Sequence, residues 1–416
     1  MIRSTVARVD LAALQSNFRA IQAFLTQATA GASDGAAVAP SHRRTPEPSH
    51  PRTPAPSHPR TAAPSRPAVP SVIAVVKANA YGHGSERVAL ALEAAGATML
   101  ACADIEEGIV LRRAGVRAPI LVFGALSVSD LEGLFEHALT PTISTPSAAR
   151  ALQMAAATHA ASLGYHLKLD TGMNRLGFRH DNLARTLPGV LSSPNLRLEA
   201  VYTHFATADA PGHALFTEQR ERFERALQTI RGLGVSGDVP RHAANSAALL
   251  CDARTWYDGV RPGLLLYGIV PPPLASTIPL QPVMSLTSRV VAVKGLRPGE
   301  SVGYGCRFNT QGPSTIAVVP AGYADGLDLR LGQHGQVLIR GRRVPIVGAV
   351  SMDMMTVDVT ELGDVQPGDE VVLIGRQGTE SWQQIDVREM AAAIGTIPYE
   401  IVCRIGARIE RQYIVT

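Results

Sequence analysis

Lys77 has the clearest chemical potential in this sequence. It follows the apolar run Val72–Val76 and precedes Tyr81, Gly82 and Gly84. Apolar residues on both alternating faces predict a parallel strand that is covered on both sides and ends near the glycines. Burial lowers the pKa of a lysine and frees its neutral amine, a nucleophile toward carbonyl carbons. A lysine whose stem only snorkels from a strand end would give the same pattern.

The regular alternation of apolar runs with amphipathic segments predicts the element that carries Lys77. Helices are expected between the runs, for example over 85–95 and 217–231, each ended by a glycine. Eight runs joined by helical crossovers predict a TIM barrel. The expected strands are Val72–Val76, Met99–Ala103, Ile120–Phe123, Thr142–Ile143, His166–Leu169, Leu198–Thr203, Arg241–Ala244 and Gly259–Leu266.

Barrel enzymes place their active sites at the carboxyl ends of the strands. In this chain the basic side chains at those ends outnumber the acidic ones, which favours an anionic ligand. Asn245, Ser246 and Gly263 follow the last two strands, where barrels often bind phosphate through backbone N–H groups. A lysine beside a phosphate site points to pyridoxal phosphate. The residues at these ends are Lys77, Tyr81, Lys168, Asp170, Arg175, His204, Asn245, Ser246, Arg261 and Gly263.

A second domain is expected beyond Pro271. Short β-rich runs separated by Gly, Pro and Asp turns predict an all-β domain over 271–416, and residues 1–270 are assigned to the barrel domain. Tyr304 and Tyr323 lie among glycines, where a backbone can approach a ligand closely. Two glycine-rich turns with stacked tyrosines would explain the same pattern.

The segment before the first barrel strand has two parts. Asp10 can cap a helix whose apolar stripe runs from Leu11 to Leu25. An eight-residue Pro/Ser/His/Arg repeat follows from Pro40, and we interpret about 31–70 as a disordered insertion because it lacks large apolar side chains. Its recurring histidines match no metal-ligand spacing. The insertion is expected at the amino-terminal face of the barrel, away from the active site.

Composition excludes several classes of function. The chain has 416 residues and a net charge of +4. The excess is local, because 40–70 holds five arginines against Glu47 alone (5 − 1 = +4), so no nucleic-acid partner is expected. No apolar run approaches a membrane span, and the start lacks the apolar core of a signal peptide, which predicts a cytoplasmic protein with no membrane partner. Four distant cysteines indicate reduced thiols and no metal site.

The motifs resemble those of the alanine racemases over nearly the whole chain. The stretch Ala74–Gly84 is similar to the cofactor-lysine signature of that family almost letter for letter. The other matching blocks follow in the same order: Lys168–Gly177, Thr203–Ala206, Asn245–Ser246, Val260–Gly263, Gly303–Gly305, Gly322–Gly326 and Met352–Asp353. The resemblance implies fold type III pyridoxal-phosphate architecture in a head-to-tail homodimer. It also implies interconversion of L- and D-alanine, which supplies D-alanine for peptidoglycan.

The resemblance implies two bases, one on each face of the substrate. Lys77 matches the base for the D-isomer, and Tyr304, from the partner subunit, matches the base for the L-isomer. A free tyrosine has a pKa near 10, so cationic neighbours must lower it, and His204 and Arg261 match the family's pair. Arg261 would also face the pyridine nitrogen and keep it unprotonated, which favours racemisation over transamination.

The remaining site residues are implied in the same way. Arg175 matches a residue beside the cofactor's phenolic oxygen and the substrate carboxylate, and Lys168 matches a lysine that is carbamylated in many members. The chain departs from part of the family at Ala407, where some members have a tyrosine that contacts the phosphate. Cofactor-binding positions are Lys77, Tyr81, Arg175, His204, Asn245, Ser246, Arg261, Gly263 and Leu264; substrate-binding positions are Arg175, Tyr323, Met352 and Asp353.

Other functions fit parts of the same sequence. A broad-specificity or serine racemase would share all these motifs, because pocket size alone discriminates weakly between such substrates. A non-catalytic pyridoxal-phosphate barrel protein would need neither the second domain nor Tyr304. An amino-acid decarboxylase on a related barrel would favour an acidic group where Arg261 stands.

Overall fold

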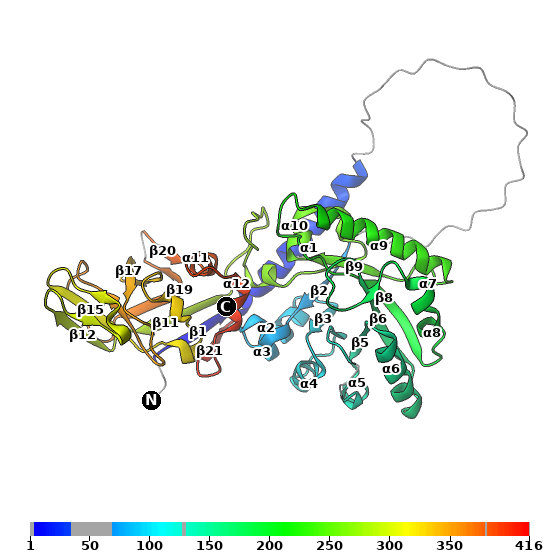
Figure 1. Cartoon of the computed structure of the whole chain (residues 1–416), viewed down its shortest axis with the longest axis horizontal. Coiled ribbons are helices and arrows are strands. Elements are labelled where there is room, and N and C mark those ends of the chain that lie inside the picture. Colours follow the sequence, from blue (N-terminus) through cyan, green and yellow to red (C-terminus); the bar gives the residue numbers. More distant parts are fainter. Residues whose placement is uncertain (1–3, 35–68, 127–129, 379–380, 416) are drawn as a thin grey trace, which may run out of the picture.

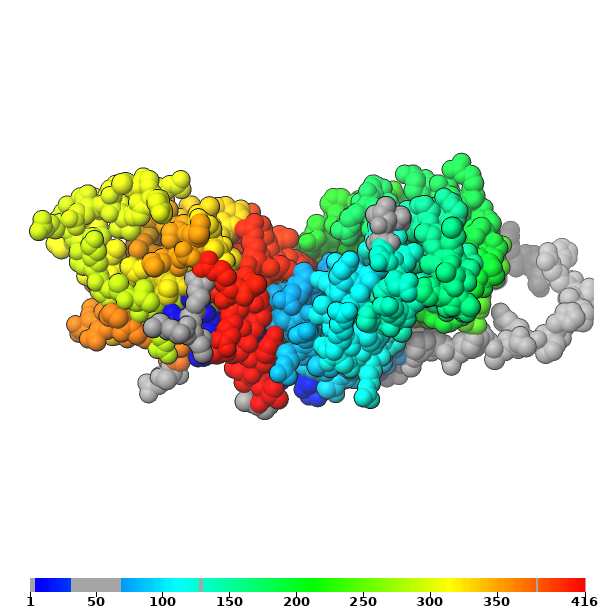
Figure 2. All heavy atoms as spheres, turned by 90° about the horizontal axis from the view of Figure 1, so that it is seen from below, coloured from blue at the N-terminus to red at the C-terminus, as the bar shows by residue number. Residues whose placement is uncertain are grey.

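The chain forms an elongated molecule with a barrel at one end and a β-rich domain at the other (Figure 1). The computed structural model describes residues 4–34, 69–126, 130–378 and 381–415. The C-terminal segment lies between the two bodies, next to the first elements of the barrel (Figure 2). No helix in the described ranges is both long and apolar enough to cross a membrane.

Eight parallel strands close the barrel, as predicted. Neighbouring strands pair around the ring in the order β5-β4-β3-β2-β10-β9-β8-β6, and pairing of β5 with β6 closes it. Most of their residues are buried, which explains the continuous apolar runs in the sequence. The strands are β2 (Ser71–Val75), β3 (Met99–Cys102), β4 (Ile120–Val122), β5 (Thr140–Ile143), β6 (Leu163–Asp170), β8 (Leu196–Tyr202), β9 (Arg241–Asn245) and β10 (Gly259–Arg261).

Helices connect successive strands, but the last strand is followed by the short turn η2 (Leu264–Tyr267). The N-terminal helix α1 (Leu11–Asp34) contacts both η2 and α3 (Ser85–Ala94) and so covers this part of the barrel. Asp10 caps α1 as predicted, because its Oδ1 accepts the N–H of Ala13 at 2.8 Å. The other principal helices are α4 (Ile105–Arg113), α5 (Glu132–Glu136), α6 (Pro146–Thr158), α9 (Ala214–Gly232) and α10 (Ser246–Cys251).

The predicted insertion begins later than expected, because α1 continues through residues 31–34. The rest of the predicted disorder, over 35–68, lies outside the described residues. The chain enters the barrel at Ser71, which pairs with Gly259 at the start of β10. Lys77 follows the opposite end of β2. The attachment point of the segment is therefore at the amino ends of the strands, as the sequence predicts.

The second domain is built on an antiparallel sheet with one parallel edge. The strands pair in the order β12-β15-β18-β17-β16-β19-β11-β1-β21, and β20 pairs with β19. Two short helices, α11 (Val387–Ala393) and α12 (Pro398–Cys403), accompany it. The strands of this sheet that follow the barrel are β11 (Met284–Arg289), β12 (Ala292–Leu296), β15 (Ser314–Val319), β16 (Gln336–Ile339), β17 (Arg342–Val347), β18 (Met355–Asp358), β19 (Glu370–Gln377), β20 (Gln383–Ile385) and β21 (Glu410–Ile414), and β13 (Ser301–Val302) pairs with β14 (Phe308–Asn309) in a separate two-stranded sheet.

The predicted domain boundary is wrong for the first residues of the chain. Strand β1 (Val6–Asp10), which lies within the range 1–270 assigned to the barrel, is antiparallel to β11 and parallel to β21. Its alternating side chains bury Ala7 and Val9 in the second domain. The predicted fold class, a TIM barrel followed by a β domain, is confirmed.

The end of the chain packs directly against the glycines that follow Lys77. Arg411 Nε donates to the carbonyl of Gly82 at 2.7 Å. A Cβ atom at Gly82 would lie 2.0 Å from the Val402 carbonyl oxygen, and one at Gly84 would lie 1.8 Å from the Tyr413 hydroxyl. Both glycines also have positive φ angles. They are required for this contact between domains as well as for ending the strand.

Candidate active site

A cavity of about 610 Å³ opens at the carboxyl ends of the barrel strands. It brings together nine of the predicted site residues and also includes residues that sequence reasoning missed. The predicted residues in its wall are Lys77, Tyr81, Lys168, Arg175, His204, Asn245, Ser246, Arg261 and Gly263; the additional ones include Phe123, Met173, Tyr202, Ile397 and Tyr399.

Lys77 begins a short turn of left-handed helix, α2 (Lys77–Tyr81). The four residues from Ala78 to Tyr81 all have φ between 52° and 53°. Side chains other than glycine seldom adopt this conformation, which costs about 1–2 kcal/mol per residue. Strain of this size persists where the surrounding structure enforces it, and it concentrates at functional sites. The sequence predicted a strand ended by glycines, not this turn.

Glu107, in the first turn of α4, holds the start of the left-handed turn. Its Oε1 accepts the N–H of Ala78 at 2.6 Å, and its Oε2 accepts the N–H of Ala103 at 2.8 Å. Asn79 Oδ1 accepts the N–H of Ser85 and so fixes the other end. These contacts direct Lys77 into the cavity, where burial and then the charge of Arg175 lower its pKa.

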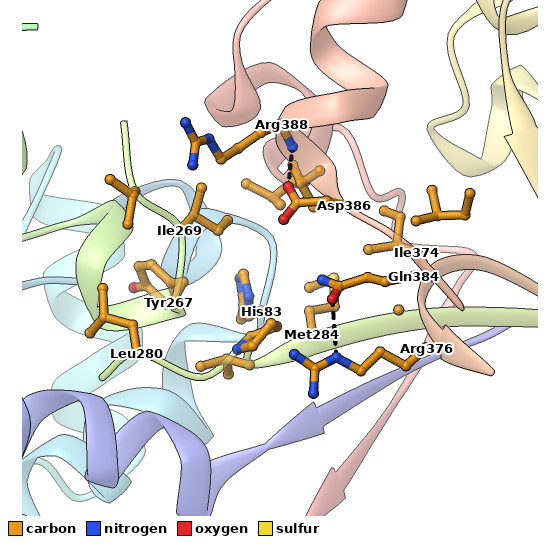
Figure 3. A pocket seen from close by; sticks show the side chains of 18 of the residues that line it. His83, Tyr267, Ile269, Leu280, Met284, Ile374, Arg376, Gln384, Asp386 and Arg388 are labelled. Carbon is orange, nitrogen blue, oxygen red and sulfur yellow. Dashed lines mark hydrogen bonds between the residues drawn. The ribbon is translucent and has the colours of Figure 1, made fainter. Parts of the chain in front are cut away.

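His83 supports the turn from behind, at a second cavity of about 310 Å³ between the two domains (Figure 3). Its Nδ1 lies 2.8 Å from the Tyr81 carbonyl oxygen and 3.1 Å from that of Ala80. Carbonyls only accept hydrogen bonds, so Nδ1 carries the proton. Burial lowers the pKa of His83 to about 4, which keeps the ring neutral. Its face packs on Tyr267, whose hydroxyl donates to the carbonyl of Val75.

Arg261 is a buried guanidinium without a carboxylate partner among the described residues. Its Nη1 lies 2.7 Å from His242 Nδ1, and its Nη2 donates to the carbonyls of Thr203 and Ala243 and lies 3.4 Å from His204 Nδ1. Burial lowers the pKa of Arg261 to about 10. Its Nε–H makes no hydrogen bond within the described chain. Arg261 therefore offers the cavity one fixed N–H donor.

The ring of Tyr202 lies within cation–π distance of two of the cations. The Arg261 guanidinium carbon lies 5.1 Å from the centre of its ring, and Lys168 Nζ lies 5.7 Å from it. His242 stacks on the same ring and contacts His166 at 3.0 Å. Sequence reasoning missed these residues, although Tyr202 immediately precedes the recognised Thr203-His204 pair at a strand end.

The cavity is strongly cationic. Its wall carries Lys77, Lys168, Arg175 and Arg261, and no carboxylate belongs to the described part of it. Asp170, expected at this face, instead shapes the following loop, where its Oδ1 accepts the N–H groups of Gly172 and Asn174. Burial, followed by the charge of Arg175, lowers the pKa of Lys168 to about 8. Such a cavity requires an anionic ligand.

A cradle for one anionic group lies at the ends of β9 and β10. Ser246 Oγ accepts the N–H of Gly263 at 2.9 Å, which leaves its own O–H free to donate. A Cβ at Gly263 would lie 2.3 Å from the Tyr81 hydroxyl, so only glycine admits the tyrosine there. Asn245 caps α10 through Oδ1. Leu264 is fully buried and its side chain is not in the cavity wall, although its backbone N–H has no partner in the described chain.

The second domain of this chain does not bring its predicted site residues into the cavity. Tyr304, Tyr323 and Met352 are 77%, 43% and 52% exposed, respectively. Tyr304 instead borders a separate apolar hollow with Gly303, Ala349 and Met354. Asp353 is ion-paired with Arg408 at 2.6 Å. The assignment of these four residues to a partner subunit's site remains a prediction.

Two family models match most of the chain. The model of the alanine racemase N-terminal domain covers residues 60–271, and that of the C-terminal domain covers 283–413. The chain belongs to the alanine racemase family. Membership makes it an isomerase that racemises alanine with pyridoxal phosphate as cofactor. The resemblance found in the sequence motifs is thus confirmed.

Curated alanine racemases are similar along most of their length. The protein of Halothermothrix orenii is 42% identical over 344 residues, which cover 82% of this chain and 89% of the relative. That of Symbiobacterium thermophilum is 43% identical over 345 residues, covering 83% and 90%.

Solved alanine racemase structures agree with the fold. The Streptomyces lavendulae structure has a TM-score of 0.84 at 30% identity and covers 100% of this chain and 98% of its own. The Bacillus anthracis structure, with bound L-Ala-P, has a TM-score of 0.81 at 33% identity and covers 100% and 96%. The Bartonella henselae structure, with covalently bound pyridoxal phosphate, has a TM-score of 0.79 at 26% identity and covers 99% of each chain.

The cavity of this alanine racemase family member fits that cofactor. Lys77 supplies an amine of lowered pKa for covalent attachment. Ser246, Gly263 and Tyr81 lie together in the wall of the same cavity and can hold a phosphate, and the free Nε–H of Arg261 can donate to a ring nitrogen. No feature of the described wall conflicts with the group.

Proposed function

We propose that the protein interconverts L- and D-alanine with two bases, Lys77 and the partner subunit's Tyr304, in a homodimer with shared active sites. The observation that supports this most directly is the placement of Lys77 and the buried Arg261 in one cavity. A basic amine on one side and a permanent cation in place of a carboxylate suit proton transfer at an α-carbon.

We propose that Lys77, Tyr81, Asn245, Ser246, Gly263, Leu264 and Arg261 hold pyridoxal phosphate. When bound, the cofactor withdraws electrons from the substrate and makes its α-proton acidic. Arg261 keeps its proton, because burial lowers its pKa only to about 10. It would therefore donate a hydrogen bond to the pyridine nitrogen without protonating it. By leaving that nitrogen unprotonated, Arg261 would favour return of the proton to the α-carbon of the substrate.

Arg175 is proposed to hold the substrate carboxylate together with the backbone N–H of Met352 of the partner subunit. Arg175 lines the cavity beside Lys77, which makes it a suitable cationic anchor. The N–H of Met352 donates to no acceptor within the described chain. Lys168 is the proposed carbamylation site, because a pKa of about 8 leaves part of its amine neutral at physiological pH. A carbamate there would supply the carboxylate that the cavity lacks and would orient Arg175.

The second base is proposed to come from the other subunit. Tyr304 is 77% exposed on the second domain and does not belong to the wall of the cavity of its own chain. The partner subunit's Tyr304 would approach the substrate opposite Lys77, beside His204 and Arg261. Its phenolic oxygen would accept the α-proton of L-alanine while the Lys77 ammonium protonates the opposite face. In the conversion of D-alanine to L-alanine, Lys77 accepts the α-proton and the partner subunit's Tyr304 donates one.

The biological role is also proposed rather than established. D-alanine supply for peptidoglycan follows from the family resemblance, and the cytoplasmic location expected from the sequence stays a prediction. Tyr323 and Asp353 are proposed to narrow the entrance of the partner subunit's site. A narrow entrance favours a small side chain such as that of alanine.

Mixed dimers test the shared site. Lys77→Ala and Tyr304→Phe chains with different affinity tags are coexpressed, and the heterodimer is purified with both tags. Each homodimer lacks one base in both sites, whereas the heterodimer has one site with both bases and one with neither. We expect negligible racemisation in the homodimers and about half the wild-type activity in the heterodimer. A heterodimer as inactive as its parents would exclude base sharing between subunits.

Substrate choice is tested with a panel of L- and D-amino acids. We expect kcat/KM for alanine to exceed that for serine, whose added hydroxyl must fit the same entrance. Similar kcat/KM values for alanine and serine would instead indicate a broad-specificity racemase, the alternative that the sequence analysis left open. Chiral chromatography of the products measures each direction separately.

A further inference from the structure

Arg408 joins the two loops that carry Tyr323 and Met352. Its Nη2 donates to Asp353 Oδ1 at 2.6 Å, and its Nε lies 3.2 Å from Asp325 Oδ1. Asp325 ends the turn η4 (Tyr323–Asp325), and Asp353 directly follows Met352. A single guanidinium thus connects both loops, a geometry that a point charge such as a lysine ammonium reproduces poorly.

The first of these loops is rigidly held. Asp325 is 1% exposed, and its Oδ2 accepts the N–H of Gly322 at 3.0 Å. Its carbonyl accepts the N–H of Gly406, so the segment before Arg408 is fixed to the same residue. A Cβ at Gly326 would lie 2.0 Å from the Arg404 carbonyl oxygen, which shows how closely the two segments approach. Asp325 therefore gives Arg408 an immobile anchor.

The second loop lies against the first through its backbone. The N–H of Tyr323 donates to the carbonyl of Ser351, and the N–H of Ala324 donates to that of Met352, both at 3.0 Å. Within the loop, the N–H of Ser351 donates to the carbonyl of Met354 at 2.8 Å. Met352 itself is half exposed and has a free backbone N–H. The direction of that N–H depends on how firmly this turn is held.

We propose that Arg408 is a positioning residue for substrate binding: by holding Asp353 against the buried Asp325, it aims the Met352 N–H and the Tyr323 ring into the partner subunit's active site. This inference rests on the shared site proposed above. Arg408 and Asp353 are 39% and 51% exposed, so this ion pair adds little to stability. Asp325 is buried but also accepts the N–H of Gly322, so removal of Arg408 should misplace a donor and lower stability without unfolding the domain.

Two mixed dimers place the same substitution on different sides of one active site. In the first, Arg408→Ala is on the chain that also carries Lys77→Ala, so the only working barrel receives the altered loops. In the second, Arg408→Ala is on the chain with native Lys77, so that barrel receives native loops from its Lys77→Ala partner. The reference is the dimer of one Lys77→Ala chain and one otherwise native chain.

We expect the first dimer to have a KM for L-alanine about tenfold above the reference, with kcat changed much less, because substrate positioning is weakened. The second dimer should match the reference. In the homodimer, Arg408→Lys should give an intermediate KM, because an ammonium keeps the charge but spans the two carboxylates less well. Arg343→Ala, which breaks an ion pair with Glu389 in the same domain, is the matched control and should leave KM unchanged.

Equal KM values in the two mixed dimers, or an Arg343→Ala effect as large as that of Arg408→Ala, would overturn the inference. Failure of the shared site would show separately, as absence of activity in the heterodimer of Lys77→Ala and Tyr304→Phe chains.

Discussion

The barrel and the second domain place their chemical groups in opposite ways. In the barrel, Lys77 and Arg261 are largely buried in a cavity whose supporting contacts all come from the same chain. In the second domain, Tyr304 and Met352 lie at the surface with 77% and 52% exposure. The barrel half of the site is formed by one chain on its own, whereas in the proposed dimer the other half acts on the barrel of the partner subunit. Each half therefore makes its own experimental predictions.

The largest effect is expected from substitution of Lys77 or Tyr304, and the two variants should differ in whether pyridoxal phosphate is covalently attached. Lys77→Ala should abolish attachment of pyridoxal phosphate and lower racemisation by on the order of 10⁴-fold, whereas Tyr304→Ala should lose turnover but keep the attachment. Borohydride reduction followed by peptide mass mapping locates the bound cofactor. The chain has only three lysines, Lys77, Lys168 and Lys294, so the assignment is unambiguous. Labelling of Lys168 in the native enzyme would refute the role of Lys77.

A smaller effect is expected at the phosphate cradle. Gly263→Ala would place a Cβ 2.3 Å from the Tyr81 hydroxyl and displace it. Loss of one hydrogen bond to a charged group weakens cofactor binding by about tenfold. Spectroscopic titration of the apoenzyme with pyridoxal phosphate measures this. Gly189→Ala, which meets no atom within 4 Å, should bind like the native enzyme. Equal affinity for both variants would contradict the assigned cradle.

The buried cations of the barrel should also make stability depend on pH. Burial lowers the pKa of Lys168 to about 8 in the folded protein, whereas an unfolded lysine titrates near pH 10.4. Between these values the unfolded chain binds more protons, so the contribution of Lys168 to the free energy of unfolding rises with pH. Relative to Lys168→Met, the native enzyme kept free of CO₂, so that Lys168 is not carbamylated, should therefore gain stability from pH 7.5 to 9.5.

Urea unfolding at fixed protein and cofactor concentration measures this difference. Lys294→Met alters an exposed lysine of the second domain. Its free energy of unfolding should differ from that of the native enzyme by an amount that does not change with pH. If the difference in free energy of unfolding between the native enzyme and Lys168→Met does not change with pH, burial does not lower the pKa of Lys168.

The smallest effect is expected far from both halves of the site. Deletion of residues 35–67 removes a segment that joins α1 to the amino end of β2, opposite the end that carries Lys77. Turnover and KM for alanine should remain close to native values, as initial rates would show. A severe loss in a deletion protein that stays soluble would refute the placement of this segment away from the active site.

The sequence predicted the barrel well because its strands are buried on both faces. The run Val72–Val76 is apolar at every position, and such runs leave little choice of structure. Strand β1 was missed because Val6–Asp10 is only five residues long and pairs with segments at the other end of the chain. No local pattern predicts such pairing.

The site was predicted in its residues but not in its geometry. The motif that carries Lys77 could be recognised, but not the left-handed conformation of Ala78–Tyr81, which the carboxylate of Glu107 and the packing of α12 enforce. Tyr202 and His242 also escaped notice, because a buried aromatic at a strand end resembles ordinary core. Arg408 could not be interpreted either, since its partners Asp325 and Asp353 are distant in the sequence.

The parallel pairing of β1 with β21 constrains when the second domain can finish folding during synthesis. Val6–Asp10 leaves the ribosome first, yet its neighbours in the sheet are Met284–Arg289 and Glu410–Ile414. At about 5–20 residues per second, this strand waits on the order of tens of seconds for its first neighbour. The barrel can close during that interval. Strand β1 gains its second neighbour only after β21 has been translated, so the sheet of the second domain is completed much later than the barrel.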